Sequence, residues 1–324
     1  MKELVLVIDR RDVSISLEGG TICVRRPNHP PEFVPLGLLG LVVIHGNPMV
    51  GSSVLRTLGE LAIPTVLLPT KGRGTGAWIS PALGTSIAVR VAQHRAARGE
   101  RRLAIARGMV WEKLAAYRAL AQKHGFEEAV ARIEAAMDRL DDAQDAITLQ
   151  GLEGTGASAW WSALAERLRA QWGFYGRNRR PPRDPVNALL SLGYTLVAAE
   201  MEMAIHAYGL DPALGFLHEV VPGRHTLVLD LMEPLRAGVD AFVLQSLEGG
   251  LLEPADFRCS RRDGCRLAES GKRIFYQAWA GARVLWPDPR GGMMGLPDAC
   301  RRQARWLRDI LGPYDPQTGE AVHG

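Results

Sequence analysis

The sequence is organised around residues 215–240, GFLHEVVPGRHTLVLDLMEPLRAGVD. His218 comes first and is followed by Asp230 and Glu233, whose spacing of three puts two side chains on one face of a helix. An imidazole and two carboxylates near one point predict a site for a hard divalent cation. The structural alternatives are a core position for His218 and a salt-bridged pair of acids with Arg236 as partner.

Another carboxylate comes from residues 151–161, GLEGTGASAWW. Apolar residues at helical spacing follow it and are expected to pack inward, namely Ala157, Trp160, Leu164 and Leu168. We therefore expect Glu153 at the start of a buried helix face, where an unpaired carboxylate is costly. A metal ion would supply the positive partner.

The length of 324 residues suggests about two domains of ~150 residues each, and 47% hydrophobic residues suffice for a sizeable core. Short aliphatic segments separated by Gly, Pro and Asn predict strands at 4–8, 13–17, 21–25, 41–44 and 65–68 and a short helix at 51–62. Helical periodicity dominates the later sequence. The predicted fold class is α+β, with a small N-terminal β-rich domain over 1–81 followed by a larger all-α catalytic domain over 82–324.

Net charge, cysteine spacing and hydropathy limit which partners and which cellular compartment the sequence predicts. The net charge of +4 fits an anionic partner without requiring one. Cys259 and Cys265 have no zinc or redox spacing, and we interpret them as two free thiols in a loop. The N-terminus has no signal-peptide core, and the longest apolar run, 35–44, is too short to span a bilayer. These features predict a cytoplasmic protein that is not inserted in a membrane.

Several ordered motifs resemble the family of CRISPR-associated integrases that acquire spacers. They are Glu153-Gly154, PPRDPVNALLSLGY at 181–194, GLDPALGFLH at 209–218, Gly223-Arg224 and LVLDLMEPLR at 227–236. By this resemblance Glu153, His218 and Glu233 match the family's metal ligands, and Asp230 matches an additional acid close to the metal. The resemblance is close over the C-terminal half and looser over the N-terminal half.

The resemblance also implies partners and a reaction. The N-terminal domain would form a homodimer and contact a small CRISPR-associated partner subunit that bridges two dimers. The substrates would be double-stranded DNA, a spacer precursor and the CRISPR repeat at whose boundary both 3' ends are inserted. Such a reaction conserves phosphodiester bonds and needs no ATP.

Three protein ligands leave open positions for water or phosphate oxygens, as a catalytic metal site requires. Oxygen-rich coordination favours Mg²⁺, and the imidazole also suits Mn²⁺. Zinc fits less well because no cysteine joins the set. Pro234 predicts that Glu233 lies at a break in the helix.

Residues 176–184, GRNRRPPRD, are predicted to contact DNA. Two prolines stiffen this loop, so we expect its arginines to project toward phosphates, among them Arg177, Arg180 and Arg183. Arg224 is the arginine best placed in the sequence to neutralise charge at the site. The same reasoning applies more weakly to a basic group that could follow a phosphate backbone or be a solvated helix face: Arg90, Arg95, Arg98, Arg101, Arg102 and Arg107.

Asp184 and Pro185 predict the start of a helix that runs to Gly209. In the family that the sequence resembles, this helix lines the active site, so Asn187 and Tyr194 would support the site without binding the metal. A cap of its own backbone is an equally good interpretation of Asn187.

The residues alone leave the nucleophile open. Water would make the protein a nuclease, whereas a DNA 3'-hydroxyl would make it an integrase. The resemblance favours the integrase. The alternatives are a general metal-dependent nuclease acting on branched DNA in repair and a non-catalytic DNA-binding assembly subunit whose acidic cluster is structural.

Overall fold

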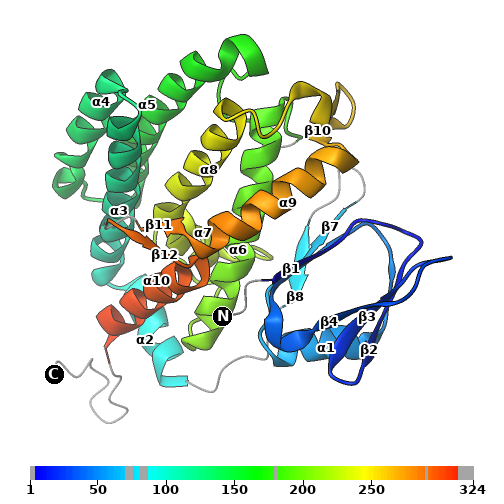
Figure 1. Ribbon diagram of the computed structural model, residues 1–324. Helices are drawn as coiled ribbons and strands as arrows, with labels where there is room; N and C mark the ends of the chain where they lie inside the picture. Colours follow the sequence, from blue (N-terminus) through cyan, green and yellow to red (C-terminus); the bar gives the residue numbers. More distant parts are fainter. Residues whose placement is uncertain (1–3, 70–75, 80–86, 179–180, 289–290, 313–324) are drawn as a thin grey trace.

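The structure is a computed structural model that describes residues 4–69, 76–79, 87–178, 181–288 and 291–312. Figure 1 shows a small strand-rich part, in blue, beside a larger part made mostly of helices. This arrangement confirms the predicted α+β class and the order of its two parts. The predicted boundary at residue 81 falls outside the described residues.

The strand-rich part consists of two four-stranded sheets and one helix. In the first sheet β1, β5 and β7 are parallel and β8 is antiparallel to β7, in the order β1 (Leu4–Ile8), β5 (Leu39–His45), β7 (Thr65–Leu68), β8 (Ala77–Ile79). The second sheet has the order β4 (Glu32–Pro35), β3 (Thr21–Arg25), β2 (Ser14–Glu18), β6 (Met49–Val50). Helix α1 (Ser52–Glu60) follows β6, and the 3-10 turn η1 (Leu36–Leu38) precedes β5.

Strand β5 joins the two parts of the molecule because it is covered on both faces. Its alternate residues point to opposite sides: Val42 and Ile44 lie in the core of the strand-rich part, whereas Leu41 and Val43 lie in the main helical core. The carbonyl oxygen of Gly40 accepts a hydrogen bond of 2.8 Å from Arg283 in the helical part. The strand-rich part is therefore packed firmly onto the helices.

The helical part is built around one central helix, α6 (Pro185–Ala207). The other helices are α2 (Ile87–Arg98), α3 (Arg101–Lys123), α4 (Glu127–Met137), α5 (Ala146–Trp172), α7 (Thr226–Met232), α8 (Arg236–Glu248), α9 (Glu269–Val284) and α10 (Leu296–Leu311). Short 3-10 turns lie at η2 (Leu140–Asp142), η3 (Glu233–Leu235) and η4 (Pro254–Asp256). Two hairpins complete this part, β9 (Phe257–Ser260) with β10 (Gly264–Leu267) and β11 (Trp286–Pro287) with β12 (Met293–Met294).

Helix α6 begins where the sequence predicts. The Asp184 side chain accepts a hydrogen bond of 2.8 Å from the Asn187 backbone N–H, and Pro185 occupies the first turn. By length and composition α6 is apolar enough to cross a membrane, and it is longer than the apolar run at residues 35–44. However, 78% of its most apolar window is buried inside the protein, so α6 is the core helix here.

Two details of the structure differ from the predictions. The helical part is not purely helical, because it contains the two short hairpins. Cys259 and Cys265 form a disulfide rather than two free thiols. The antiparallel register of β9 and β10 places these two residues directly opposite one another, and a spacing rule for metal or redox motifs does not detect that pairing.

Candidate functional site

Glu153 and Glu233, predicted as metal ligands from distant parts of the sequence, lie together in the structure. The ammonium group of Lys113 joins them: it donates a hydrogen bond to Glu153 Oε1 and lies 2.5 Å from Glu233 Oε2. The three side chains come from α5, η3 and α3, and they are 20%, 5% and 9% exposed. The centre of the site is therefore a largely buried cation between two acids.

Local sequence explains how these elements meet. Helix α7 ends at Met232 and Pro234 lies within η3, so Glu233 stands at the break that the proline predicts. Gly156 lets α3 and α5 approach closely, because a Cβ atom at this position would lie 2.6 Å from Leu114 Cδ2. That approach brings Lys113 of α3 to Glu153 of α5.

The position of Glu153 within its helix differs from the prediction. Helix α5 begins at Ala146, where the Asp145 side chain caps the helix by accepting a hydrogen bond of 2.7 Å from the Thr148 N–H. Glu153 thus lies about two turns inside α5 and not at its start. Its ion pair with Lys113 satisfies the carboxylate that was expected to need a positive partner.

Glu233 is held in its ionised form. Burial alone would raise the pKa of this carboxyl, but Arg236 and Lys113 outweigh burial and lower the pKa to about 2. The Arg236 Nε atom lies 2.9 Å from Glu233 Oε2. Glu233 in turn raises the pKa of the buried Arg236 guanidinium, against the effect of burial. His218 also contributes to the lowered pKa of Glu233.

Asp230 orients His218. Its Oδ1 lies 2.6 Å from His218 Nδ1, and the fully buried carboxylate also accepts backbone hydrogen bonds from Phe216, Leu217 and His218 at 2.5, 2.9 and 3.2 Å. With a proton on Nδ1 donated to Asp230, the ring presents the lone pair of Nε2. These contacts give Asp230 a positioning role, whereas Glu233 faces Lys113.

The loop that carries His218 is fixed by three residues whose role at this loop was not predicted from the sequence. A Cβ atom on Gly215 would lie 2.5 Å from Asp230 Oδ2, so glycine is required for the loop to approach α7. Arg102 Nε donates to the Phe216 carbonyl at 2.9 Å, and Gln150 Nε2 donates to the Leu217 carbonyl at 2.7 Å. Gln150 lies three residues before Glu153, a helical spacing that could have revealed it.

The donor set fits Mg²⁺ or Mn²⁺, although no three His, Cys, Asp or Glu side chains in the described part of the chain lie close enough together to hold an ion in this arrangement. The Lys113 ammonium lies between Glu153 and Glu233. Two carboxylates and one imidazole nitrogen are ligands that both metals accept. The cysteines lie in a disulfide or are buried as Cys23 and Cys300, which leaves no thiolate for zinc.

Tyr194 and Asn187, predicted to support the site, make different contacts. The Tyr194 hydroxyl donates to Asp240, and its ring lies 4.6 Å from the guanidinium carbon of Arg236, the partner of Glu233. Asn187 Oδ1 instead accepts hydrogen bonds from Arg177 and from the Asn178 N–H at 2.6 and 2.9 Å. Tyr194 thus adjoins the site, whereas the Asn187 side chain orders the loop after α5 and does not cap its own backbone, because Asp184 caps the helix.

The predicted DNA-contacting arginines have different environments. Arg177 does not project outward as expected, because its guanidinium bonds to Asn187 and lies 5.2 Å from the Tyr194 ring. Arg183 and Arg224 are exposed, and Arg180 lies outside the described residues.

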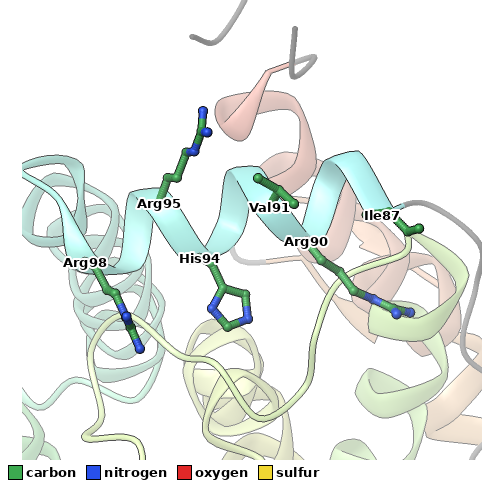
Figure 2. Close-up of a pocket in the computed structure, with 6 residues that line it drawn as sticks. All are labelled: Ile87, Arg90, Val91, His94, Arg95 and Arg98. Carbon is green, nitrogen blue, oxygen red and sulfur yellow. The ribbon is translucent and has the colours of Figure 1, made fainter. Parts of the chain in front are cut away.

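Helix α2 presents a further basic surface. Arg90, His94 and Arg98 point to one side of this helix in Figure 2, and Arg95 points to the other. Together with Ile87 and Val91 they line an open surface cavity of about 510 Å³. Arg102, from the same predicted basic group, instead bonds to Phe216 in the histidine loop. Some arginines of the predicted basic group therefore lie on the surface of α2, whereas Arg102 is used inside the protein to hold the histidine loop.

Fold and site together define an α+β protein whose helical part holds two carboxylates, Glu153 and Glu233, that share the ammonium group of Lys113. The sequence matches the family described as CRISPR associated protein Cas1 over residues 6–281, and the chain therefore belongs to that family. A relative from Thermus thermophilus, named CRISPR-associated endonuclease Cas1 3, is 35% identical over 324 residues and covers 96% of each chain.

Solved structures share the fold. A Cas1 protein from Thermotoga maritima has a TM-score of 0.82 at 20% identity and covers 99% of both chains. A casposase bound to an integration product has a TM-score of 0.78 at 22% identity and covers 94% of this chain and 91% of its own. A Cas6-RT-Cas1–Cas2 complex has a TM-score of 0.77 at 22% identity, with 96% of this chain and 35% of the other covered.

Proposed function

We propose that this Cas1-family protein is a metal-dependent DNA integrase that joins the 3'-hydroxyl ends of short DNA duplexes to the boundaries of a CRISPR repeat. The observations that carry the proposal are that Glu153 and Glu233 share the Lys113 ammonium group and that Asp230 orients His218. Membership of a family whose relatives are named endonucleases supports phosphodiester chemistry. The structural likeness to a casposase bound to an integration product supports strand joining.

Each residue has a defined task in the proposed reaction. Glu153, Glu233 and His218 Nε2 would hold Mg²⁺ or Mn²⁺, which supplies a Lewis acid for the scissile phosphate and lowers the pKa of the attacking hydroxyl. Arg236 keeps Glu233 ionised and in place. Asp230 holds the His218 ring through Nδ1, which leaves the other ring nitrogen, Nε2, available as a ligand.

The partners are proposed from the same resemblance. They are double-stranded DNA, a second copy of this chain joined through the N-terminal part, and a small CRISPR-associated subunit that bridges two such dimers. The fold shared with the Cas6-RT-Cas1–Cas2 complex supports the partner subunit. Exposed Arg183 and Arg224 would contact DNA phosphates, and cytoplasmic DNA would be the target.

A strand-joining assay tests this function. Purified protein, with and without the small subunit, is mixed with Mg²⁺ or Mn²⁺, a labelled duplex with 3'-hydroxyl ends and a plasmid carrying a CRISPR array. We expect label to become attached at the repeat boundary, and we expect Glu153→Gln or Glu233→Gln to abolish the attachment. Glu166→Gln, an exposed glutamate on the same helix as Glu153, is the matched control and should join normally.

Other outcomes identify the alternatives. Cleavage that continues when the 3' ends are blocked, without attachment, would indicate a general nuclease acting on branched DNA. DNA binding without metal-dependent chemistry, unchanged in Glu233→Gln, would indicate a non-catalytic assembly subunit.

A further inference from the structure

Lys113 is a buried cation that the sequence analysis did not select. Its side chain is only 9% exposed, and its ammonium group contacts carboxylates from two other elements, Glu153 of α5 and Glu233 of η3. Lysine ammonium groups are strongly hydrated, so burying one is costly unless acids compensate it. The position of this charge is therefore fixed by the same two carboxylates that would bind the metal.

The charges around Lys113 are balanced without a metal ion. Glu153 and Glu233 together carry two negative charges, and Lys113 and Arg236 carry two positive charges within ion-pair distance of them. Glu233 has both cations near one oxygen, Oε2, at 2.5 Å from Lys113 and 2.9 Å from Arg236. The metal-free protein can thus keep both acids close together without strong repulsion between them.

A divalent ion and the Lys113 ammonium would compete for the same place. An ion coordinated by Glu153 and Glu233 would lie against the oxygens that Lys113 now contacts, and two cations that close repel strongly in a buried site. Arg236 lies in α8, not in α3, and could keep its ion pair with Glu233 when Lys113 leaves. Lys113 is consequently the cation that must move.

We propose that Lys113 is a built-in counter-ion that holds Glu153 and Glu233 together before metal binds and that a divalent ion must displace. This inference rests on the metal site of the proposed function. Lys113 is a positioning residue: it assembles the site in the metal-free protein and lowers the protein's affinity for metal. Metal loading is then an exchange of one cation for another and not the filling of an open site.

Calorimetric titration of the full-length, DNA-free protein with Mn²⁺ tests the exchange. Lys113→Met keeps the length of the side chain and removes its charge, so we expect Mn²⁺ to bind on the order of ten- to a hundredfold more tightly than to the unmodified protein. Without metal this variant should melt at a lower temperature than the unmodified protein. Mn²⁺ should raise the melting temperature of the variant by more than it raises that of the unmodified protein. Lys123→Met, an exposed lysine at the end of the same helix, controls for net charge and should leave the affinity unchanged.

A second measurement needs no variant. The chain has only five lysines, so the Nζ resonance of Lys113 can be assigned and followed by ¹⁵N-lysine NMR as Mg²⁺ is added. We expect this resonance to shift on saturation while that of Lys123 stays in place.

Equal or weaker Mn²⁺ binding by Lys113→Met, or an unmoved Lys113 resonance in protein saturated with Mg²⁺, would overturn the inference and leave the proposed function standing. An unmodified protein that binds no divalent ion would instead overturn the proposed function itself.

Discussion

The substitution Asp230→Asn tests whether the Asp230 carboxylate positions His218 or only stabilises the fold. Asparagine keeps the shape of the side chain but has one NH₂ group in place of an oxygen. Each oxygen of Asp230 accepts two hydrogen bonds, Oδ2 from the Phe216 and Leu217 N–H groups and Oδ1 from the backbone and ring of His218. Either orientation of the amide therefore turns its NH₂ group toward two donors.

The magnitude follows from this geometry. At least two hydrogen bonds to a charged acceptor are lost, each worth about 1.5–3 kcal/mol, so the free energy of unfolding should fall by about 3–6 kcal/mol. Because His218 also loses its orienting partner, Mn²⁺ affinity should fall by roughly 10- to 100-fold. Urea unfolding at pH 7 without metal measures the first quantity, and calorimetric titration measures the second.

Asp240→Asn is the matched control. Asp240 is also fully buried, but among the described residues it accepts hydrogen bonds from two side chains, Tyr194 and Trp160, and burial raises its pKa to about 6 against their effect. The amide resembles the protonated acid, so this variant should lose about 1–2 kcal/mol and bind Mn²⁺ normally. Equal effects of the two substitutions on Mn²⁺ affinity would refute the positioning role of Asp230.

Three further predictions concern packing, pH and the disulfide. Gly215→Ala should push Asp230 away from the loop and weaken Mn²⁺ binding, as measured by calorimetry, because the added methyl group would lie 2.5 Å from Oδ2; unchanged binding would contradict the close approach. Burial lowers the pKa of His45 to about 4 from 6.5, so the unfolded chain takes up a proton first and stability should fall by up to about 3 kcal/mol as the pH drops from 6.5 to 4. His45→Gln should remove that part of the slope in urea titrations, and an unchanged slope would exclude His45 as its source. Replacing both Cys259 and Cys265 by serine should cost about 2 kcal/mol, because the disulfide closes a short loop, and mass spectrometry under non-reducing conditions should show no free thiol at either position in the unmodified protein.

Local chemistry made part of the fold predictable. Asp184 and Pro185 predict the start of α6. Pro234 predicts the break between α7 and η3 at which Glu233 lies. Strand β4, by contrast, is exposed along most of its length and has no alternating pattern to detect. It forms because β3 supplies hydrogen-bonding partners, and that information lies outside the segment itself.

The candidate site was predictable only for residues with motif context. Glu153 and Glu233 were chosen from their surroundings and do meet in the structure. Lys113 could not be chosen, because it lies within an ordinary helix and becomes significant only when α3 packs between two distant elements. Arg177 was misplaced because a proline-rich loop was expected to hold it outward, whereas the oxygen of Asn187 and the Tyr194 ring draw it inward.

The most direct test of the account is a crystal structure of the protein soaked in Mn²⁺, with anomalous scattering used to locate the ion. We expect one Mn²⁺ bound by carboxylate oxygens of Glu153 and Glu233 and by His218 Nε2, with the Lys113 ammonium moved away from both acids. Absence of an anomalous peak at saturating Mn²⁺, with Lys113 still bridging Glu153 and Glu233, would contradict the assignment of this cluster as the metal centre.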